Sequence, residues 1–131
     1  MKYLCLVYGE ERALESCPDG DCLAFDASIR ESGHCIASEA LQPVATATTV
    51  RVRNGKVAVV DGPFAETKEL VAGYTIIEVR SREEALEWTR QFPNPAVDGG
   101  VGQIEVRQFF DLGDFPESAA IAQFREMMAT K

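Results

Sequence analysis

A β-hairpin is predicted in the middle of the chain, around Asn54-Gly55. Both residues tolerate the positive φ angles of a two-residue turn, and they separate two stretches rich in β-branched residues, Thr46–Arg53 and Lys56–Val60. A turn of this length fixes which residues face each other across the two strands. The expected pairs are Arg53 with Lys56, Val52 with Val57, and Val50 with Val59. The valines therefore share one face of the hairpin, and Thr49, Arg51 and Arg53 share the other.

The hairpin interrupts a repeated strand–helix–strand pattern. Strands are predicted over Lys2–Tyr8, His34–Ser38, Gly73–Arg80 and Gln103–Phe110. A first helix is predicted over Cys22–Ser32, capped by Asp19 or Asp21. A second follows a capping box of Ser81 and Glu84 and has Ala85, Trp88 and Phe92 on one side. A third is predicted from Asp114 onward. This order indicates an α+β fold, a ferredoxin-like sandwich with an inserted β-hairpin. Helices then cover one face of the sheet, so a second copy of the chain is expected on the other, giving a homodimer.

Size and charge exclude several classes of partner. The chain has 131 residues, the size of one domain, and a net charge of −8. An acidic surface repels phosphate backbones and anionic lipids, so no nucleic acid or membrane partner is expected. The single histidine, His34, excludes a site with several imidazoles within one chain, and the carboxylates have no useful ligand spacing, so no metal is expected. No glycine-rich phosphate loop follows a strand, and no cofactor is expected.

The cysteines and the N-terminus indicate a cytoplasmic protein. Cys5, Cys17, Cys22 and Cys35 form no Cys-x-x-Cys pair, and we expect reduced, mostly buried thiols. The apolar run at the N-terminus is too short for the core of a signal peptide. No segment approaches the ~20 apolar residues that span a bilayer.

The segment Asp61–Glu69 is unusual for a turn or a core element. Asp61-Gly62-Pro63 forms a rigid turn, Phe64 is a lone aromatic anchor, and Glu66, Lys68 and Glu69 bring three charges into four residues. Spacing alone is also compatible with a solvated loop whose charges form weak surface pairs.

This segment resembles the signature of DGPF-type proteins, a branch of the YCII-related family. Supporting matches are Met1-Lys2-Tyr3-Leu4, Ser32-Gly33-His34, Glu39-Ala40-Leu41-Gln42-Pro43, Ala47-Thr48-Thr49-Val50-Arg51, Asn54-Gly55-Lys56, Gly73-Tyr74, Glu84-Ala85 and Ile104-Glu105-Val106-Arg107. Departures are Leu70-Val71-Ala72-Gly73-Tyr74, where the family has a Gln-Leu-Gly-Gly-Phe type of sequence, and Gln108, where it has proline. The resemblance implies a family domain over residues 1–110, with residues 111–131 as an extension whose short helix packs on it. It also implies a dimeric α/β barrel, two sheets face to face around a cavity.

The resemblance and the residues together give the candidate site. In the wider family a His–Asp pair is proposed to be catalytic, and this makes Asp61 and His34 the catalytic candidates. Each residue also has a structural explanation: Asp61 can hold its own turn, and His34 can bind the carbonyl groups at a helix end. The ligand-binding candidates are Phe64, Glu66, Lys68, Tyr74, Arg51, Glu105 and Arg107. Glu105 and Arg107 share a strand face, where they form an ion pair or bind an anion. Arg51, Lys68 and Arg107 predict a positively charged cavity inside an acidic protein.

Two classes of function follow. The first is a small-molecule-binding protein whose ligand is anionic, acting as a regulatory accessory to a sigma factor of the extracytoplasmic-function type; the family resemblance implies that partner. The second is a small cofactor-free enzyme of isomerase, lyase or dehydrochlorinase type with an Asp-centred acid–base site. An enclosed pocket with a base in reach of a ligand favours the enzyme, and a filled interface favours an interaction protein.

Overall fold

A computed structural model describes residues 1–9, 19–62, 70–93 and 102–129 of the chain. The strands are β1 (Lys2–Gly9), β2 (Cys35–Ala40), β3 (Thr48–Arg53), β4 (Lys56–Asp61), β5 (Leu70–Glu78) and β6 (Gln103–Gln108). The α-helices are α2 (Asp19–Glu31), α3 (Arg82–Thr89) and α4 (Ala119–Ala129), and two short 3₁₀ turns are η1 (Val44–Thr46) and η2 (Leu112–Asp114). The predicted order of elements and the α+β class are confirmed. None of these described helices combines the length and apolarity needed to cross a membrane.

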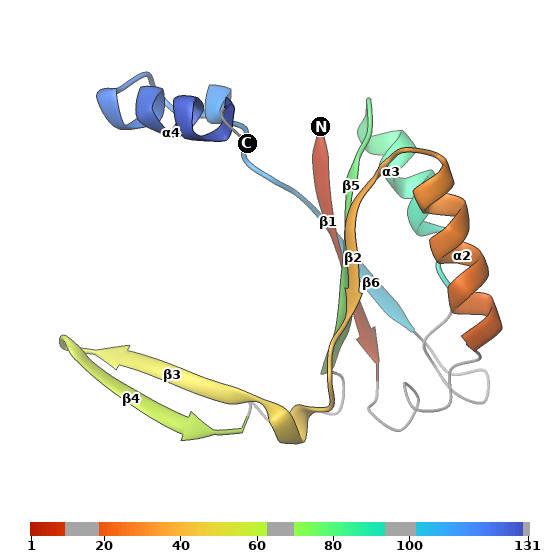
Figure 1. Cartoon of the computed structure of the whole chain (residues 1–131), viewed down its shortest axis with the longest axis horizontal. Helices are drawn as coiled ribbons and strands as arrows, with labels where there is room; N and C mark the ends of the chain where they lie inside the picture. The colour runs from red at the N-terminus through yellow and green to blue at the C-terminus, as the bar shows by residue number, and fades with distance from the viewer. Residues whose placement is uncertain (10–18, 63–69, 94–101, 130–131) are drawn as a thin grey trace.

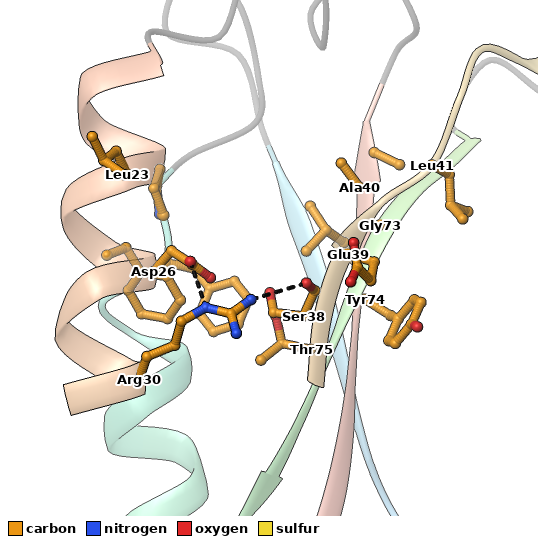
Figure 2. A pocket seen from close by; sticks show the side chains of 15 residues that line it. Leu23, Asp26, Arg30, Ser38, Glu39, Ala40, Leu41, Gly73, Tyr74 and Thr75 are labelled. Atoms are coloured by element: carbon orange, nitrogen blue, oxygen red, sulfur yellow. Dashed lines mark hydrogen bonds and ion pairs between the residues drawn. The ribbon is translucent and has the colours of Figure 1, made fainter. Parts of the chain in front are cut away.

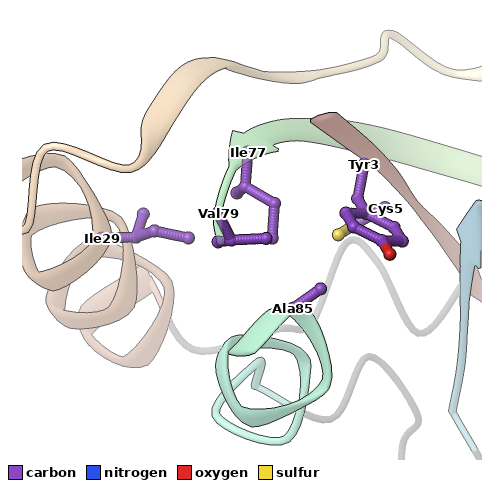
Figure 3. Packing of buried hydrophobic residues seen from close by; sticks show 6 residues of the cluster. All are labelled: Tyr3, Cys5, Ile29, Ile77, Val79 and Ala85. Carbon is purple, nitrogen blue, oxygen red and sulfur yellow. The ribbon is translucent and has the colours of Figure 1, made fainter. Parts of the chain in front are cut away.

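Four strands form one sheet in the order β2-β5-β1-β6, and every neighbouring pair is antiparallel. Helices α2 and α3 lie on the same face of this sheet (Figure 1). Alternate residues of β1 and β5 point toward them and are buried, as the period of two along a strand requires. The core between sheet and helices consists of Tyr3, Cys5, Ile29, Ile77, Val79 and Ala85 (Figure 3).

The opposite face of the sheet is not covered by α2 or α3. We call it the open face; its residues alternate with the buried ones and are Leu4, Leu6, Tyr8, Tyr74, Ile76, Glu105 and Arg107. Leu4 lies across from Ile76, and Leu6 across from Tyr74, so apolar side chains run through its centre. All of these residues keep part of their surface accessible in the single chain.

The hairpin has the predicted register. Val52 pairs with Val57, and Val50 with Val59, around a turn in which Asn54 and Gly55 have φ angles of 52° and 76°. Strand β3 begins two residues later than predicted, because Thr46 ends the 3₁₀ turn η1. Its amide and hydroxyl both donate to the carbonyl oxygen of Pro43, at 2.9 and 2.7 Å.

One of the two hydrogen bonds of the predicted capping box at helix α3 is confirmed. The Ser81 hydroxyl accepts a hydrogen bond from the Glu84 amide at 3.1 Å. The Glu84 carboxylate does not complete the reciprocal bond of a capping box. It accepts instead from the Arg80 amide at 3.5 Å and lies 3.1 Å from the His34 ring.

The C-terminal helix begins later than predicted. Asp114 lies in the turn η2, and α4 starts at Ala119 with the Ser118 hydroxyl accepting from the Ile121 amide. Helix α4 contacts η2 and stands away from the four-stranded sheet (Figure 1). The expected packing of this helix on the domain is therefore not seen within the single chain.

Candidate functional site

A bulge in β2 determines which of its side chains face α2. Cys35 pairs with Ile77, but Ala37 pairs with Ile76, so Ile36 is an extra residue in the strand. Beyond this bulge Ser38 lies opposite Thr75, whose side chain is buried on the helix-covered face. The Ser38 and Thr75 hydroxyls are 3.0 Å apart and form a hydrogen bond.

Arg30 joins helix α2 to this strand (Figure 2). Its Nε donates to Asp26 Oδ2 at 2.6 Å, one helical turn earlier, and its Nη2 donates to the Ser38 carbonyl oxygen at 3.2 Å. The bond and charge of Asp26 raise the pKa of Arg30, so the guanidinium keeps its charge. These two bonds use two of the five N–H groups of a guanidinium.

A cavity of about 520 Å³ lies beside these residues, between α2 and the β2–β5 edge, the side of the sheet where β2 is the outermost strand and β5 is its neighbour. Its apolar lining includes Leu23, Phe25, Leu41 and Phe92, and the Phe25 and Phe92 rings are 4.3 Å apart. The polar residues of its lining are Asp26, Arg30, Ser38, Glu39, Tyr74 and Thr75. This volume is in the range of small-molecule sites, which are mostly apolar with a few fixed polar groups.

Asp26, Arg30, Ser38 and Thr75 line this cavity and are not among the site residues predicted from the sequence. The spacing of Asp26 and Arg30 on a predicted helix does indicate an i, i+4 ion pair. Nothing in the sequence shows that this pair faces β2, because the bulge decides that. Tyr74 is the predicted ligand-binding residue that lines the cavity, and in Figure 2 its ring points away from α2.

Glu105 and Arg107 meet on the open face. Arg107 Nε is 3.8 Å from Glu105 Oε1, and the Tyr8 hydroxyl donates to Glu105 Oε2 at 3.1 Å. This bond to a carboxylate raises the pKa of Tyr8. Leu6 pairs with Glu105 on one side and with Tyr74 on the other, so these predicted residues share one surface.

Arg51 and Asp61 lie on the hairpin, away from that surface. Arg51 pairs with Ala58, and Asp61 with Thr48 at the base of the hairpin, where the Asp61 side chain is exposed. The turn that follows is tied to β3: the Gly62 amide donates to Ala47, and the Thr49 hydroxyl donates to the Gly62 carbonyl oxygen at 2.6 Å. The predicted ligand-binding residues Phe64, Glu66 and Lys68 lie outside the described residues.

His34 lies at a third place, between the sheet and the start of α3. Its Nδ1 is 2.9 Å from the Glu78 carbonyl oxygen, and its Nε2 is 3.1 Å from Glu84 Oε1. The edge of its ring meets Trp88, with ring centroids 5.9 Å apart. Both nitrogens face protein oxygen atoms, and His34 does not line the cavity beside Arg30. The two catalytic candidates, His34 and Asp61, are thus separate within one chain.

Cys5 and Cys35 have free thiols. Cys5 is buried in the core and Cys35 is half-buried at the start of β2. Burial raises the pKa of both thiols, although Arg30 acts in the opposite direction on Cys35. Within the described ranges, no three His, Cys, Asp or Glu side chains are close enough to hold a metal ion together.

Comparison with known proteins gives the family. The profile of the YCII-related domain matches residues 1–110. The chain is also 32% identical, over 96 residues, to an uncharacterized protein of Rhizobium meliloti (strain 1021); the match covers 73% of this chain and 77% of the relative. The domain match spans every strand of the sheet and both helices that cover it, including the segment with the Asp-Gly-Pro-Phe sequence. The chain therefore belongs to the YCII-related family.

Proposed function

We propose that this protein binds a small amphipathic molecule in the cavity between α2 and the β2–β5 edge. The observation that carries the proposal is the cavity of about 520 Å³, with an apolar lining and a guanidinium at one side. The apolar body of the ligand contacts Leu23, Phe25 and Phe92. Its polar end meets Arg30 and Ser38.

The charges of the lining limit the polar end of the ligand. On the α2 side of the lining, one guanidinium, Arg30, is already paired with one carboxylate, Asp26. This pair leaves no net positive charge to attract a multiply charged anion. A carboxamide on the ligand fits this set of groups, because it can accept a hydrogen bond from Arg30 and donate one to a carboxylate. A ligand with a single carboxylate next to Arg30 also fits.

Native mass spectrometry of protein purified from its own host tests this proposal. We expect a bound small molecule on the unmodified protein and its loss from Arg30→Met, which keeps a flexible unbranched stem and removes the donors. Arg82→Met is the matched control, because Arg82 is exposed at the start of α3 and does not line the cavity. An unmodified protein that carries no small molecule, or an Arg30→Met variant that retains it fully, would refute the proposal.

We further propose that the working unit is a homodimer of ferredoxin-like sheets that meet through their open faces. The strand order β2-β5-β1-β6 around two strand–helix–strand units supports the ferredoxin-like description. The apolar centre of the open face, Leu4, Leu6 and Ile76, supports the contact, because such a surface gains free energy when it leaves water.

Light scattering coupled to size-exclusion chromatography tests the dimer. We expect a mass of two chains for the unmodified protein. Leu6→Asp places a charge at the centre of the open face and should give single chains. Leu23→Asp, on the exposed surface of α2, should leave the dimer intact. A monomeric unmodified protein contradicts the proposal.

A further inference from the structure

We infer that hairpin β3–β4 and helix α4 form a reciprocal clamp, in which the hairpin of one protomer packs on α4 of its partner. The inference rests on the proposed dimer and adds a second contact to it. The two elements are called the arms below: the hairpin arm is Thr48–Asp61, and the C-terminal arm comprises η2 and α4, residues 111–129.

The arms project on the same side of the sheet, the side of the open face, and from opposite ends of it (Figure 1). The length of the sheet separates them, so the two arms of one chain do not meet. A second copy placed on the open face lies in the space between them. A two-fold axis that brings the hairpin arm of one chain to the C-terminal arm of the other creates that contact twice.

Both arms expose apolar surface that their own chain leaves uncovered. The four paired valines of the hairpin, Val50, Val52, Val57 and Val59, are each 57–70% exposed and share one face. On α4, Phe124 and Met128 are 51% and 52% exposed and lie four residues apart, on one side of the helix. A contiguous apolar surface of this kind is typical of a protein interaction site.

Charge favours one pairing of the arms through their overall fields, since Arg51, Arg53 and Lys56 lie on the hairpin face opposite the valines. The hairpin arm contains three cationic side chains and one carboxylate, a net charge of +2. The C-terminal arm contains four carboxylates and one guanidinium, a net charge of −3. Pairing hairpin with hairpin, or α4 with α4, brings like charges together; pairing hairpin with α4 brings opposite charges together. This complementarity within one sequence identifies the occupant as a second copy of the chain.

Disulfide trapping between two single-cysteine additions tests the clamp. Val52→Cys is prepared with heavy nitrogen and Phe124→Cys with natural isotopes; the two proteins are mixed, oxidised and mapped by peptide mass spectrometry. We expect a disulfide that joins position 52 of one chain to position 124 of the other. Disulfides joining 52 to 52 or 124 to 124, in preference to the mixed product, would overturn the inference, as would the absence of a 52–124 disulfide.

Charge reversal at the hairpin turn gives an independent readout. Arg53→Glu combined with Lys56→Glu should raise the dimer dissociation constant severalfold at low salt, and the difference should shrink as salt is added. Arg82→Glu, on the far side of the sheet, is the matched control and should have no effect. An unchanged dissociation constant contradicts the clamp. A dimer without the 52–124 disulfide refutes the clamp alone, whereas a chain that stays monomeric refutes the proposed dimer as well.

Discussion

The guanidinium of Arg30 donates to the Ser38 carbonyl oxygen at 3.2 Å and thereby ties helix α2 to the edge strand β2. The Asp26 carboxylate, one helical turn earlier, accepts a hydrogen bond from the same guanidinium at 2.6 Å. Both side chains remain partly exposed, at 52% and 37%. Water therefore screens this pair, and its importance lies in positioning N–H donors beside the cavity more than in stability.

Arg30→Lys should separate binding from stability. A lysine keeps the charge, but a single ammonium cannot reproduce the planar set of donors that reaches Asp26 and Ser38 together. We expect the free energy of unfolding to change by less than about 1 kcal/mol in urea titrations, since exposed ion pairs contribute little. The co-purifying molecule should be lost in native mass spectra. Retention of the molecule, or a large loss of stability, would contradict this role.

Gly73→Ala should destabilise the sheet. A Cβ at this position would lie 2.8 Å from the Glu39 carbonyl oxygen, an atom of the neighbouring backbone that has no freedom to rotate away. The expected loss is about 1–3 kcal/mol in the free energy of unfolding, measured by urea denaturation. Gly113→Ala is the control, because its Cβ meets open space, and should change stability by no more than about 0.5 kcal/mol.

His34→Ala should weaken the fold and leave the bound molecule in place. The substitution removes the contacts of the ring with the Glu78 carbonyl oxygen, Glu84 and Trp88. We expect a loss of about 1–2 kcal/mol in thermal or urea unfolding. Arg80→Ala, whose side chain is 91% exposed, serves as the comparison and should be nearly neutral. Unchanged stability together with loss of the molecule would assign His34 to binding instead.

The buried thiol of Cys5 should make stability depend on pH. Because burial raises its pKa in the folded chain, the unfolded chain ionises first as the pH rises. The stability that depends on the protonated thiol is therefore complete below the ordinary thiol pKa of about 8.5 and is lost progressively above it. The difference in unfolding free energy between the unmodified protein and Cys5→Ala should shrink from pH 7 to pH 10. A difference that is constant or grows over this range would show that the thiol does not titrate as proposed.

The hairpin could be predicted because its register depends on local chemistry. Asn54 and Gly55 define the turn, and the valine pairs follow from it by counting. The orientation of β2 could not be predicted in the same way. Simple alternation from Cys35 would turn Ala37 and Glu39 toward α2; the extra residue at Ile36 reverses this and turns Ser38 there.

For the candidate site too, relations within one strand could be predicted, whereas relations between two packed elements could not. Glu105 and Arg107 could be placed on a shared face from their spacing along one strand, and the structure confirms their proximity. The relation of Arg30 to Ser38 joins two elements, so it depends on how a helix packs on a strand. The Glu84 carboxylate was expected to bond its own helix cap, but the His34 ring lies close enough to engage it.

The distribution of apolar side chains has a consequence for how this protein should be handled. Six apolar residues are buried among those described, whereas the valines of the hairpin arm and Phe124 and Met128 of the C-terminal arm are exposed. If these side chains enter water-free contact only in a dimer, part of the stability is set by mass action. Melting temperature should then rise with protein concentration, and dilution alone would act on this chain as a mild denaturant.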